Sequence, residues 1–279
     1  MDVVFRHWSA SWPVLIAYVL LAAAHLVGFR KTLAAPAAET TRGVLLREAA
    51  VFQLGLALIV AAILSPLGYW STVYLSARAG QELAVAVFGP GLLVLGAPWA
   101  ALRVSPGLVS RLSAWPVFAA VAANVVWIAW QLPLLADPAH GNALVRLAEY
   151  ATYVVAGVVF WLQLISSRPF AQQAPPLRRF SLLSGTVVTF TVLGMVLVFG
   201  DNRMYPAWGG ALHTAMSVVD DQQLGGAILW MGMLIPLVAA GVALLMQWFS
   251  NEESAELAAD LDRLLTPRRH DWPSRPVHR

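Results

Sequence analysis

The 279-residue sequence contains no cysteine, and only 12% of its residues are charged. The absence of cysteine excludes disulfides, thiolate metal ligands and cysteine nucleophiles. The scarcity of charge, together with 59% hydrophobic residues and a mean hydropathy of +0.67, excludes an ordinary water-soluble domain, because such a domain could not expose this much apolar surface. We therefore expect an all-α membrane protein.

Long apolar stretches take the place of charge. A membrane-spanning helix needs roughly 20 largely apolar residues. Seven stretches of the sequence meet this requirement, so the predicted fold is a polytopic bundle of seven transmembrane helices. The predicted spans are 12–29, 47–65, 82–101, 114–132, 147–165, 181–199 and 224–248.

Basic residues alternate from one side of the predicted membrane to the other. Fourteen of the 18 lie in the segments that follow spans 1, 3, 5 and 7, whereas Arg6, Arg78, Arg146 and Arg203 lie on the other side. The positive-inside rule then predicts an outer N-terminus and a cytoplasmic C-terminus. Arginines that face anionic headgroups explain the basic character of the chain, so no nucleic-acid partner is predicted.

The composition changes after the last predicted span. Residues 1–250 are expected to form one transmembrane domain, and residues 251–279 a cytoplasmic amphipathic helix with a flexible tail. Leu257, Leu261 and Leu264 recur at helical spacing, which predicts the helix. The last fourteen residues hold three prolines and four arginines with little to bury, which predicts the tail.

The stretch YLSARAGQEL places Arg78 and Glu82 at the expected mouth of the third span. Positions i and i+4 share one face of a helix, so these side chains are predicted to form an ion pair. An unpaired charge in hydrocarbon costs about 2.5–3.5 kcal/mol on insertion scales, so both should pair or face the protein interior. Two roles stay open: fixing where the helix begins, or contacting a ligand or partner.

A second polar group opens the fifth predicted span. Arg146, Glu149 and Tyr150 lie within two helical turns of one another. One interpretation is an aromatic belt with an arginine that reaches toward the interface. The other is that these residues join Arg78 and Glu82 in one polar cluster at the outer face.

The stretch VVDDQQLGGAILW opens the seventh predicted span with four consecutive polar residues. Acids at a helix N-terminus are typical caps, but four polar side chains exceed what a cap requires. The two glycines that follow allow another helix to approach closely, so a tightly packed polar junction is the alternative. The four polar residues are Asp220, Asp221, Gln222 and Gln223.

A metal site was considered for the loop before that span. His213, Met204 and Met216 share this loop, and imidazole and thioether groups suit Cu(I). No His-x-x-x-His pair occurs in the sequence, and methionine commonly fills gaps in apolar packing, so no metal site is assigned. Signatures of soluble enzymes are also missing, which indicates a protein that is not an enzyme.

Several motifs together resemble those of the CtaG-type cytochrome c oxidase assembly factors. These are bacterial seven-span proteins associated with maturation of copper-containing terminal oxidases. The resemblance covers roughly residues 45–250. The motifs, in chain order, are ILSPLGYW, SARAGQELAVAVFGPGLLVLGAPW, WIAWQLP, LVRLAEYATYVVAGVVFW, MYPAW and DDQQLGGAILW.

The resemblance also shows where this chain departs from its relatives. Family members usually have a His-x-x-x-His pair where this chain has Arg78 and Glu82, another at Arg146 and Tyr150, and often a histidine at Gln131. A guanidinium has no lone pair with which to bind copper. The resemblance therefore implies a family member in which Arg78, Glu82, Arg146 and Glu149 replace the metal ligands.

The function implied is assembly or stabilisation of a haem-copper terminal oxidase in the aerobic respiratory chain, without a copper site of its own. The expected partners are subunits of that oxidase or of another respiratory complex, together with membrane lipids, in the bacterial plasma membrane. Three alternatives stay open: an accessory subunit of a respiratory complex, a copper chaperone that uses residual ligands, and a small-solute transporter. Transporters commonly show inverted repeats and midplane charges, which are not evident here.

Overall fold

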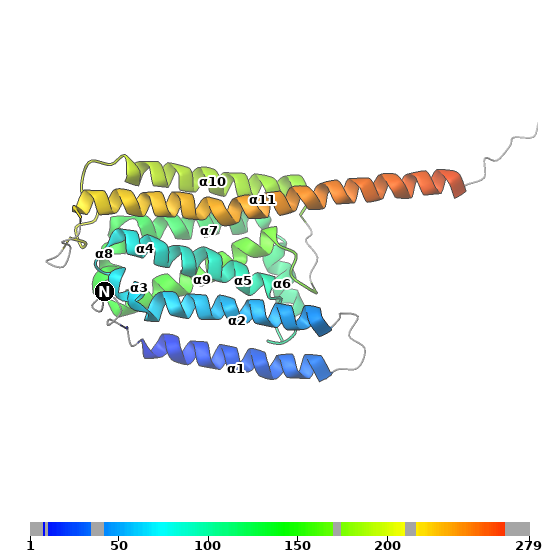
Figure 1. The fold of residues 1–279 in the computed structure, drawn as a ribbon, viewed down its shortest axis with the longest axis horizontal. Helices are drawn as coiled ribbons and strands as arrows, with labels where there is room; N and C mark the ends of the chain where they lie inside the picture. The colour runs from blue at the N-terminus through cyan, green and yellow to red at the C-terminus, as the bar shows by residue number, and fades with distance from the viewer. Residues whose placement is uncertain (1–7, 9–10, 35–41, 170–173, 210–215, 266–279) are drawn as a thin grey trace, which may run out of the picture. The chain divides into compact units, whose positions relative to one another are not determined.

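The computed structural model describes residues 8, 11–34, 42–169, 174–209 and 216–265. Every regular element in these ranges is helical, which confirms the predicted all-α class (Figure 1). The helices are α1 (Trp12–Ala34), α2 (Arg42–Leu64), α3 (Pro66–Trp70), α4 (Leu75–Glu82), the π-helix η1 (Leu83–Phe88), α5 (Gly89–Leu95), α6 (Pro106–Ser113), α7 (Pro116–Gln131), α8 (Pro133–Gly141), α9 (Ala143–Leu164), α10 (Pro176–Val198) and α11 (Val218–Leu265).

The number of membrane spans agrees with the sequence. Six helical segments in the described ranges are long and apolar enough to cross a membrane. The count becomes seven when α6 and α7, which meet at an angle of 82°, are taken as one broken span. The protein is therefore a multi-pass membrane protein of the predicted kind.

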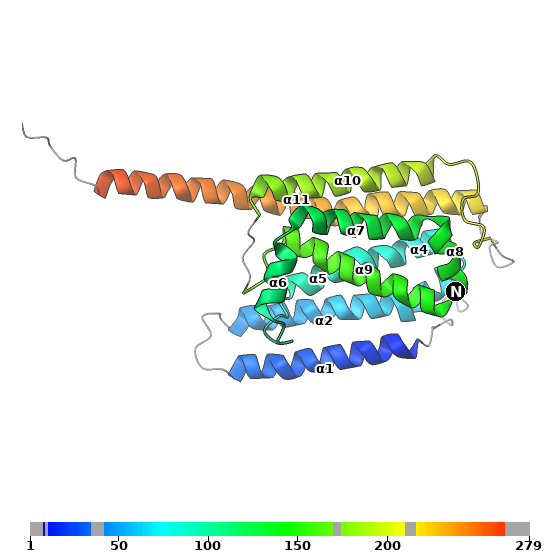
Figure 2. The ribbon, with the colours of Figure 1, turned by 180° about the vertical axis from the view of Figure 1, so that it is seen from behind.

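Contacts divide the chain into a first unit, Met1–Gly241, and a second unit, Val242–Arg279. In the first unit α2 and α9 both pack against α5, α7 packs against α9, and α1 packs against α2 (Figures 1 and 2). The span that runs from α4 through α5 is central, since 78% of its most apolar window is buried, against 6% for α1. Charged residues on this central helix are consequently surrounded by protein.

One end of the first unit gathers the short helices α3 and α8 and the beginnings of α4, α9 and α11 (Figures 1 and 2). We call it the α8 end. The described segments between predicted spans 2 and 3 and between predicted spans 4 and 5, which hold α3 and α8, belong to this end. The orientation of the α8 end toward the outer side of the membrane stays a prediction.

The second unit is helical as far as Leu265, where α11 ends. The predicted tail helix falls within this segment, and no break occurs at residue 250. Leu257 and Leu261 are exposed within the chain. The tail 266–279 lies outside the described residues, and the cytoplasmic location of the helix stays a prediction.

The third span begins earlier than the sequence suggested. Its helix starts at Leu75 and ends at Leu95, whereas residues 82–101 were predicted. The prediction was wrong because it treated Arg78 and Glu82 as the polar border of the helix. The two charges instead lie inside it, where contacts with neighbouring helices compensate them.

The proline of this span is accommodated by a local change of helix type. Pro90 lacks the N–H that an α-helix would use. The preceding segment, Leu83–Phe88, is π-helical, and the N–H of Gly89 donates to the carbonyl of Ala84. The indole Nε1 of Trp161 in α9 donates to the carbonyl of Val87 at 2.9 Å, so a neighbouring helix binds the backbone close to the proline.

The close approach of α9 to η1 and α5 predicts the effect of adding a side chain at Gly157. A Cβ atom on Gly157 would lie 2.3 Å from the carbonyl oxygen of Ala86 and 2.7 Å from the Pro90 ring, so Gly157→Ala must displace backbone. We expect a loss of about 1–3 kcal/mol, measured as a lower unfolding temperature in detergent. Gly185→Ala in α10 is the control, because nothing lies within 4 Å of its Cβ. Equal losses at both positions would contradict the packing argument.

Candidate functional site

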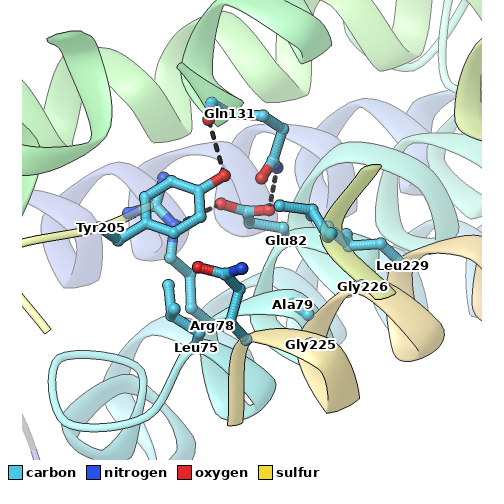
Figure 3. Close-up of a pocket in the computed structure, with 11 residues that line it drawn as sticks. Leu75, Arg78, Ala79, Glu82, Gln131, Tyr205, Gly225, Gly226 and Leu229 are labelled. Atoms are coloured by element: carbon cyan, nitrogen blue, oxygen red, sulfur yellow. Dashed lines mark hydrogen bonds and ion pairs between the residues drawn. The ribbon is translucent and has the colours of Figure 1, made fainter. Parts of the chain in front are cut away.

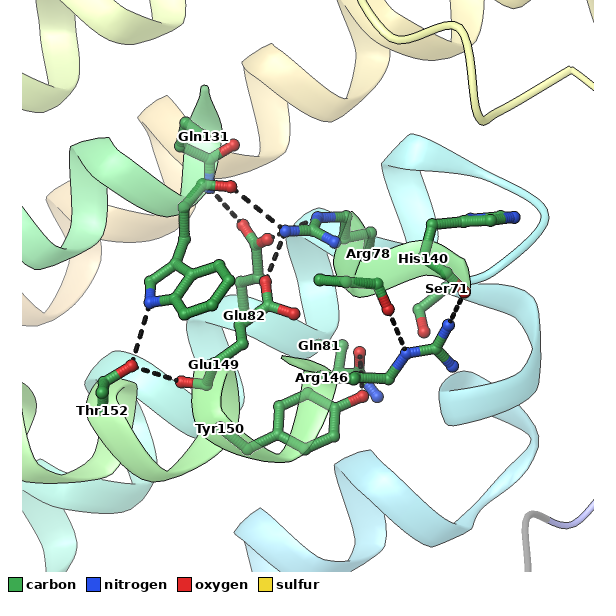
Figure 4. A network of polar contacts seen from close by, with 12 residues as sticks. Ser71, Arg78, Gln81, Glu82, Gln131, His140, Arg146, Glu149, Tyr150 and Thr152 are labelled. Atoms are coloured by element: carbon green, nitrogen blue, oxygen red, sulfur yellow. Dashed lines mark hydrogen bonds and ion pairs between the residues drawn. The ribbon is translucent and has the colours of Figure 1, made fainter. Parts of the chain in front are cut away.

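The side chain of Arg78 is the centre of a buried polar network at the α8 end. Its Nε lies 2.6 Å from Glu82 Oε1, and its Nη2 donates to Glu149 in α9. Nη2 also donates to the carbonyl of Trp130 at 3.3 Å, and the amide of Gln131 donates to the second oxygen of Glu82. One guanidinium therefore joins the three helices α4, α7 and α9 (Figure 4).

These charged groups are almost completely shielded. Arg78, Glu82 and Glu149 are 8%, 5% and 2% exposed. A buried ion pair is maintained only when further hydrogen bonds satisfy its polar atoms, and removing one partner leaves a buried charge uncompensated. The predicted ion pair between Arg78 and Glu82 is thus present, and Glu149 extends it to a triad of one guanidinium and two carboxylates.

The aromatic ring of Trp208 covers this triad. The Arg78 guanidinium carbon lies 5.0 Å from the ring centroid, within the range of a cation–π interaction. The Trp208 indole donates to the carbonyl of Ser71 at 3.0 Å, and Tyr205 donates to the carbonyl of Gln131 at 2.7 Å. Burial raises the pKa of Tyr205, which keeps its hydroxyl protonated as a donor. The loop between α10 and α11 is attached to α7 and to the segment after α3 by these bonds.

The residues Tyr205 and Trp208 were not singled out as site residues from the sequence. Both lie in the motif MYPAW, which the sequence comparison marked only as part of a resemblance. The guanidinium of Arg203 donates to the carbonyls of Pro206 and Trp208 and so holds this short loop in shape. The signal available in the sequence was two aromatic residues in a short polar loop.

Arg146 and Tyr150 lie at the rim of the network. Arg146 donates hydrogen bonds to the carbonyls of Ala139 and His140 in α8 (Figure 4). Its guanidinium therefore binds α8 and not Glu149, the partner that the spacing suggested. Tyr150 donates to Gln81 Oε1 at 3.2 Å. Burial, and secondarily the charge of Arg146, lower the pKa of His140, so this imidazole is neutral at neutral pH.

Asp221 caps a helix other than its own. Its carboxylate accepts from the backbone N–H of Leu75 at 2.6 Å and from that of Ser76 at 3.1 Å, so it closes the N-terminus of α4. Asp220 is exposed, and its backbone N–H donates to the hydroxyl of Ser217. The polar start of α11 is therefore a junction between two helices, as the sequence alternative proposed.

The glutamines of this motif hold the loop that precedes α11. Gln222 accepts from the N–H of Met204 at 2.9 Å and donates to the carbonyl of Asn202 at 3.2 Å. Gln223 donates to the carbonyl of Gly200 at 3.5 Å. Both amides thus satisfy backbone of the α10–α11 loop.

The two glycines of α11 lie where other helices approach most closely. A Cβ on Gly225 would lie 3.1 Å from the backbone of Leu75, and a Cβ on Gly226 would lie 2.5 Å from Leu197 Cβ (Figure 3). Glycine lets α4 and α10 contact α11 at these positions.

The adjacent aspartates provide a matched pair of variants. Asp221→Asn should lower stability by about 1–3 kcal/mol, because both carboxylate oxygens accept from backbone N–H groups, and an amide offers one weaker acceptor and places an N–H₂ donor against the other N–H. Asp220→Asn, at the exposed position, should change stability by less than about 0.5 kcal/mol. Thermal unfolding in detergent measures both. Similar shifts for the two variants would show that Asp221 does not cap α4.

The copper ligands considered from the sequence do not form a site in the described residues. His213 lies outside them, so the set of His213, Met204 and Met216 is not tested by the structure. The described residues contain no group of three His, Asp or Glu side chains that could hold a metal ion. The network itself offers carboxylates already bound to a guanidinium, amides and phenols, a donor set that does not fit copper.

Comparison with known proteins identifies the family. The family model described as cytochrome c oxidase caa3 assembly factor (Caa3_CtaG) matches residues 23–251, which is most of the chain and includes the three helices α4, α7 and α9 that Arg78 joins. The chain belongs to this family. No curated protein and no solved structure matches the chain. For this Caa3_CtaG protein the family assignment therefore rests on the family model, and the geometry of the network comes from its own structure.

Proposed function

We propose that this Caa3_CtaG protein assists the assembly or stabilisation of a haem-copper terminal oxidase in the bacterial plasma membrane, without holding copper itself. The family match supports the role in oxidase assembly. The single observation that supports the copper-free part is that Arg78 and Glu82, which stand where family members usually have a histidine pair, are bound to each other, and that Arg78 also binds Glu149. Neither a guanidinium nor a carboxylate paired with one replaces an imidazole for copper.

The proposed site of action is the α8 end. Its orientation toward the outer side follows from the distribution of arginine and lysine, which favours a cytoplasmic location for the opposite end. The Arg78 network joins α4, α7 and α9, and Trp208 and Tyr205 attach the α10–α11 loop to it. These buried contacts fix the helices and the loop of the α8 end relative to one another, and we propose that the exposed surface of this end contacts oxidase subunits.

Deletion and complementation in the native host test the assembly role. Deletion of the gene should lower the amount of assembled oxidase, measured from haem difference spectra and oxygen consumption of isolated membranes. The wild-type chain and His213→Ala should both restore it, because the proposal gives His213 no ligand role. An unchanged oxidase level in the deletion strain would refute an assembly function.

Metal analysis tests the copper-free part separately. The protein purified in mild detergent should contain no stoichiometric copper after exposure to Cu(I) and removal of unbound metal. Stoichiometric copper that is lost in His213→Ala would show a chaperone that uses residual ligands. Mass spectrometry of the same preparation distinguishes a transient factor, recovered alone, from an accessory subunit recovered with oxidase subunits.

A further inference from the structure

The buried network contains more negative than positive charge among the groups that touch one another. Glu82 and Glu149 both contact Arg78, and all three side chains are shielded from solvent. Two carboxylates that share one counter-charge in a site of low polarity disfavour the doubly ionised state, because each repels the other and neither is well solvated. Such a pair commonly retains one proton between its members.

The surrounding titratable groups do not remove this imbalance. They are Arg146, Tyr150 and Tyr153 on α9, Asp137 and His140 on α8, Tyr205 on the α10–α11 loop, and Asp221 on α11. His140 is neutral, and the tyrosine hydroxyls carry no charge near neutral pH. Arg146 is the nearest additional cation, but in the described residues its guanidinium binds carbonyls of α8 and forms no salt bridge. The charge of Asp221 is directed at the N-terminus of α4.

Small cavities surround Glu82 on several sides. One of about 20 Å³ lies between Arg78, Glu82, Tyr205 and Gln222 (Figure 3). A second, of about 10 Å³, lies between Glu82, Glu149 and the rim residues His140 and Tyr150 (Figure 4). These volumes are those of about one water molecule each. Water could therefore reach the carboxylates from the α8 end.

A third cavity of about 10 Å³ lies deeper, between α4, η1, α7 and α9. Glu82 lines it together with the Tyr153 hydroxyl, which interacts with the Glu82 carboxylate, and with the Trp127 indole N–H, which forms no hydrogen bond within the described part of the chain. Tyr153 and Trp127 are 1% and 2% exposed. A buried donor such as the Trp127 N–H is normally satisfied, which indicates a water that accepts from this N–H and donates to Glu82.

We propose that Glu82 and Glu149 form a proton-binding site, in which the pair holds one proton near neutral pH and exchanges it through water with the aqueous phase at the α8 end. Binding forms one O–H bond on a carboxylate oxygen and breaks one O–H bond of a hydronium ion supplied by the aqueous phase, so that the relaying water in the cavities is left neutral and no electron is transferred. The bound proton leaves one carboxylate to balance Arg78. This inference goes beyond the assembly role and does not depend on it.

Loss of the proton changes the network that the site supports. With both carboxylates ionised, two anions compete for the one guanidinium that also contacts Trp208 and the carbonyl of Trp130. The folded state binds a proton that the unfolded chain, with ordinary carboxyl groups, releases at neutral pH. Stability should therefore fall as the pH rises through the range in which the pair gives up its proton.

Infrared difference spectroscopy tests the proposal directly on the full chain in detergent or lipid. Spectra collected from about pH 5 to about pH 9 should show the carbonyl stretch of a protonated carboxylic acid that persists near neutral pH, where exposed Asp and Glu are ionised. The chain has only 15 acidic residues, so the background is small. The band should be lost or shifted in Glu149→Gln and in Glu82→Gln. It should remain in the control variant Glu48→Gln, because Glu48 forms a partly exposed ion pair with Arg168.

The outcomes that would overturn the proposal are equally specific. A wild-type spectrum without a carboxylic acid band near neutral pH refutes it, and this measurement needs no variant to fold. A band that survives in both glutamine variants places the proton elsewhere and also refutes it. Unfolding temperatures that rise with sodium or potassium concentration in the wild type, but not in Glu149→Gln, would show that a metal cation occupies the site in place of the proton.

Discussion

Arg78→Ala is expected to lower the stability of the protein by about 3–5 kcal/mol. The reason is that Glu82 and Glu149 would remain buried without their shared cation. The measurement is the unfolding temperature in detergent, together with the yield of monodisperse protein. Arg168→Ala is the control, since its side chain is 47% exposed in the pair with Glu48, and we expect a loss of about 0–1 kcal/mol.

Compensating substitutions identify which carboxylate matters. From the spacing alone, the double variant Arg78→Ala with Glu82→Ala is expected to be less destabilised than either single variant. Because the structure adds Glu149 as a second partner of Arg78, the double variant Arg78→Ala with Glu82→Ala still leaves the buried Glu149 carboxylate without its cation. Adding Glu149→Gln to Arg78→Ala should therefore recover part of the lost stability. Strictly additive losses in this double-mutant cycle would show that the two side chains do not interact.

Trp208→Ala should produce a loss of similar size, about 3–5 kcal/mol, as is typical of truncating a buried tryptophan. The ring is 1% exposed, stacks on Arg78, and packs edge-on against His140 and Tyr205. Its removal opens a cavity over the charged triad and detaches the α10–α11 loop from Ser71. The unfolding temperature measures the loss of stability, and limited proteolysis measures exposure of the loop.

Two further variants separate the parts of this effect. Trp208→Phe keeps an aromatic ring over Arg78 but removes the indole donor, so we expect a loss of about 1 kcal/mol from the hydrogen bond in addition to the smaller ring. Trp115→Ala is the control because that side chain is 73% exposed within the chain. A shift for Trp115→Ala as large as that for Trp208→Ala would contradict the role assigned to the buried ring.

The sequence predicted the class of the protein because that class depends on composition. In a continuous apolar stretch that crosses a membrane, a helix satisfies the hydrogen bonds of the backbone N–H and C=O groups. The structure confirms the all-helical class, with six or seven candidate spans in the described residues. The i, i+4 spacing also predicted that Arg78 and Glu82 would meet, because helix geometry alone brings these positions together.

The limits of this prediction are clearest at the third span. The sequence alone places Arg78 and Glu82 at the border of a span, because unpaired charges are costly in hydrocarbon. In the fold the same charges lie within the most enclosed helix, since α7 and α9 supply Gln131 and Glu149 as partners. Burial of these groups is therefore a property of the whole bundle and not of the local segment.

The sequence by itself determined the membrane class, the helices and the local ion pair, since each depends on composition or on neighbours within one or two turns. Only the tertiary structure decided that Glu149, 71 positions from Arg78, completes the triad, and that Asp221 caps a helix 146 positions away. It also decided that Arg146 binds carbonyls of α8 instead of Glu149. The physical reason is that a buried polar group forms its hydrogen bond with whichever partner the packing of helices brings within reach. Spacing along the chain carries no information about that partner when it lies on another helix.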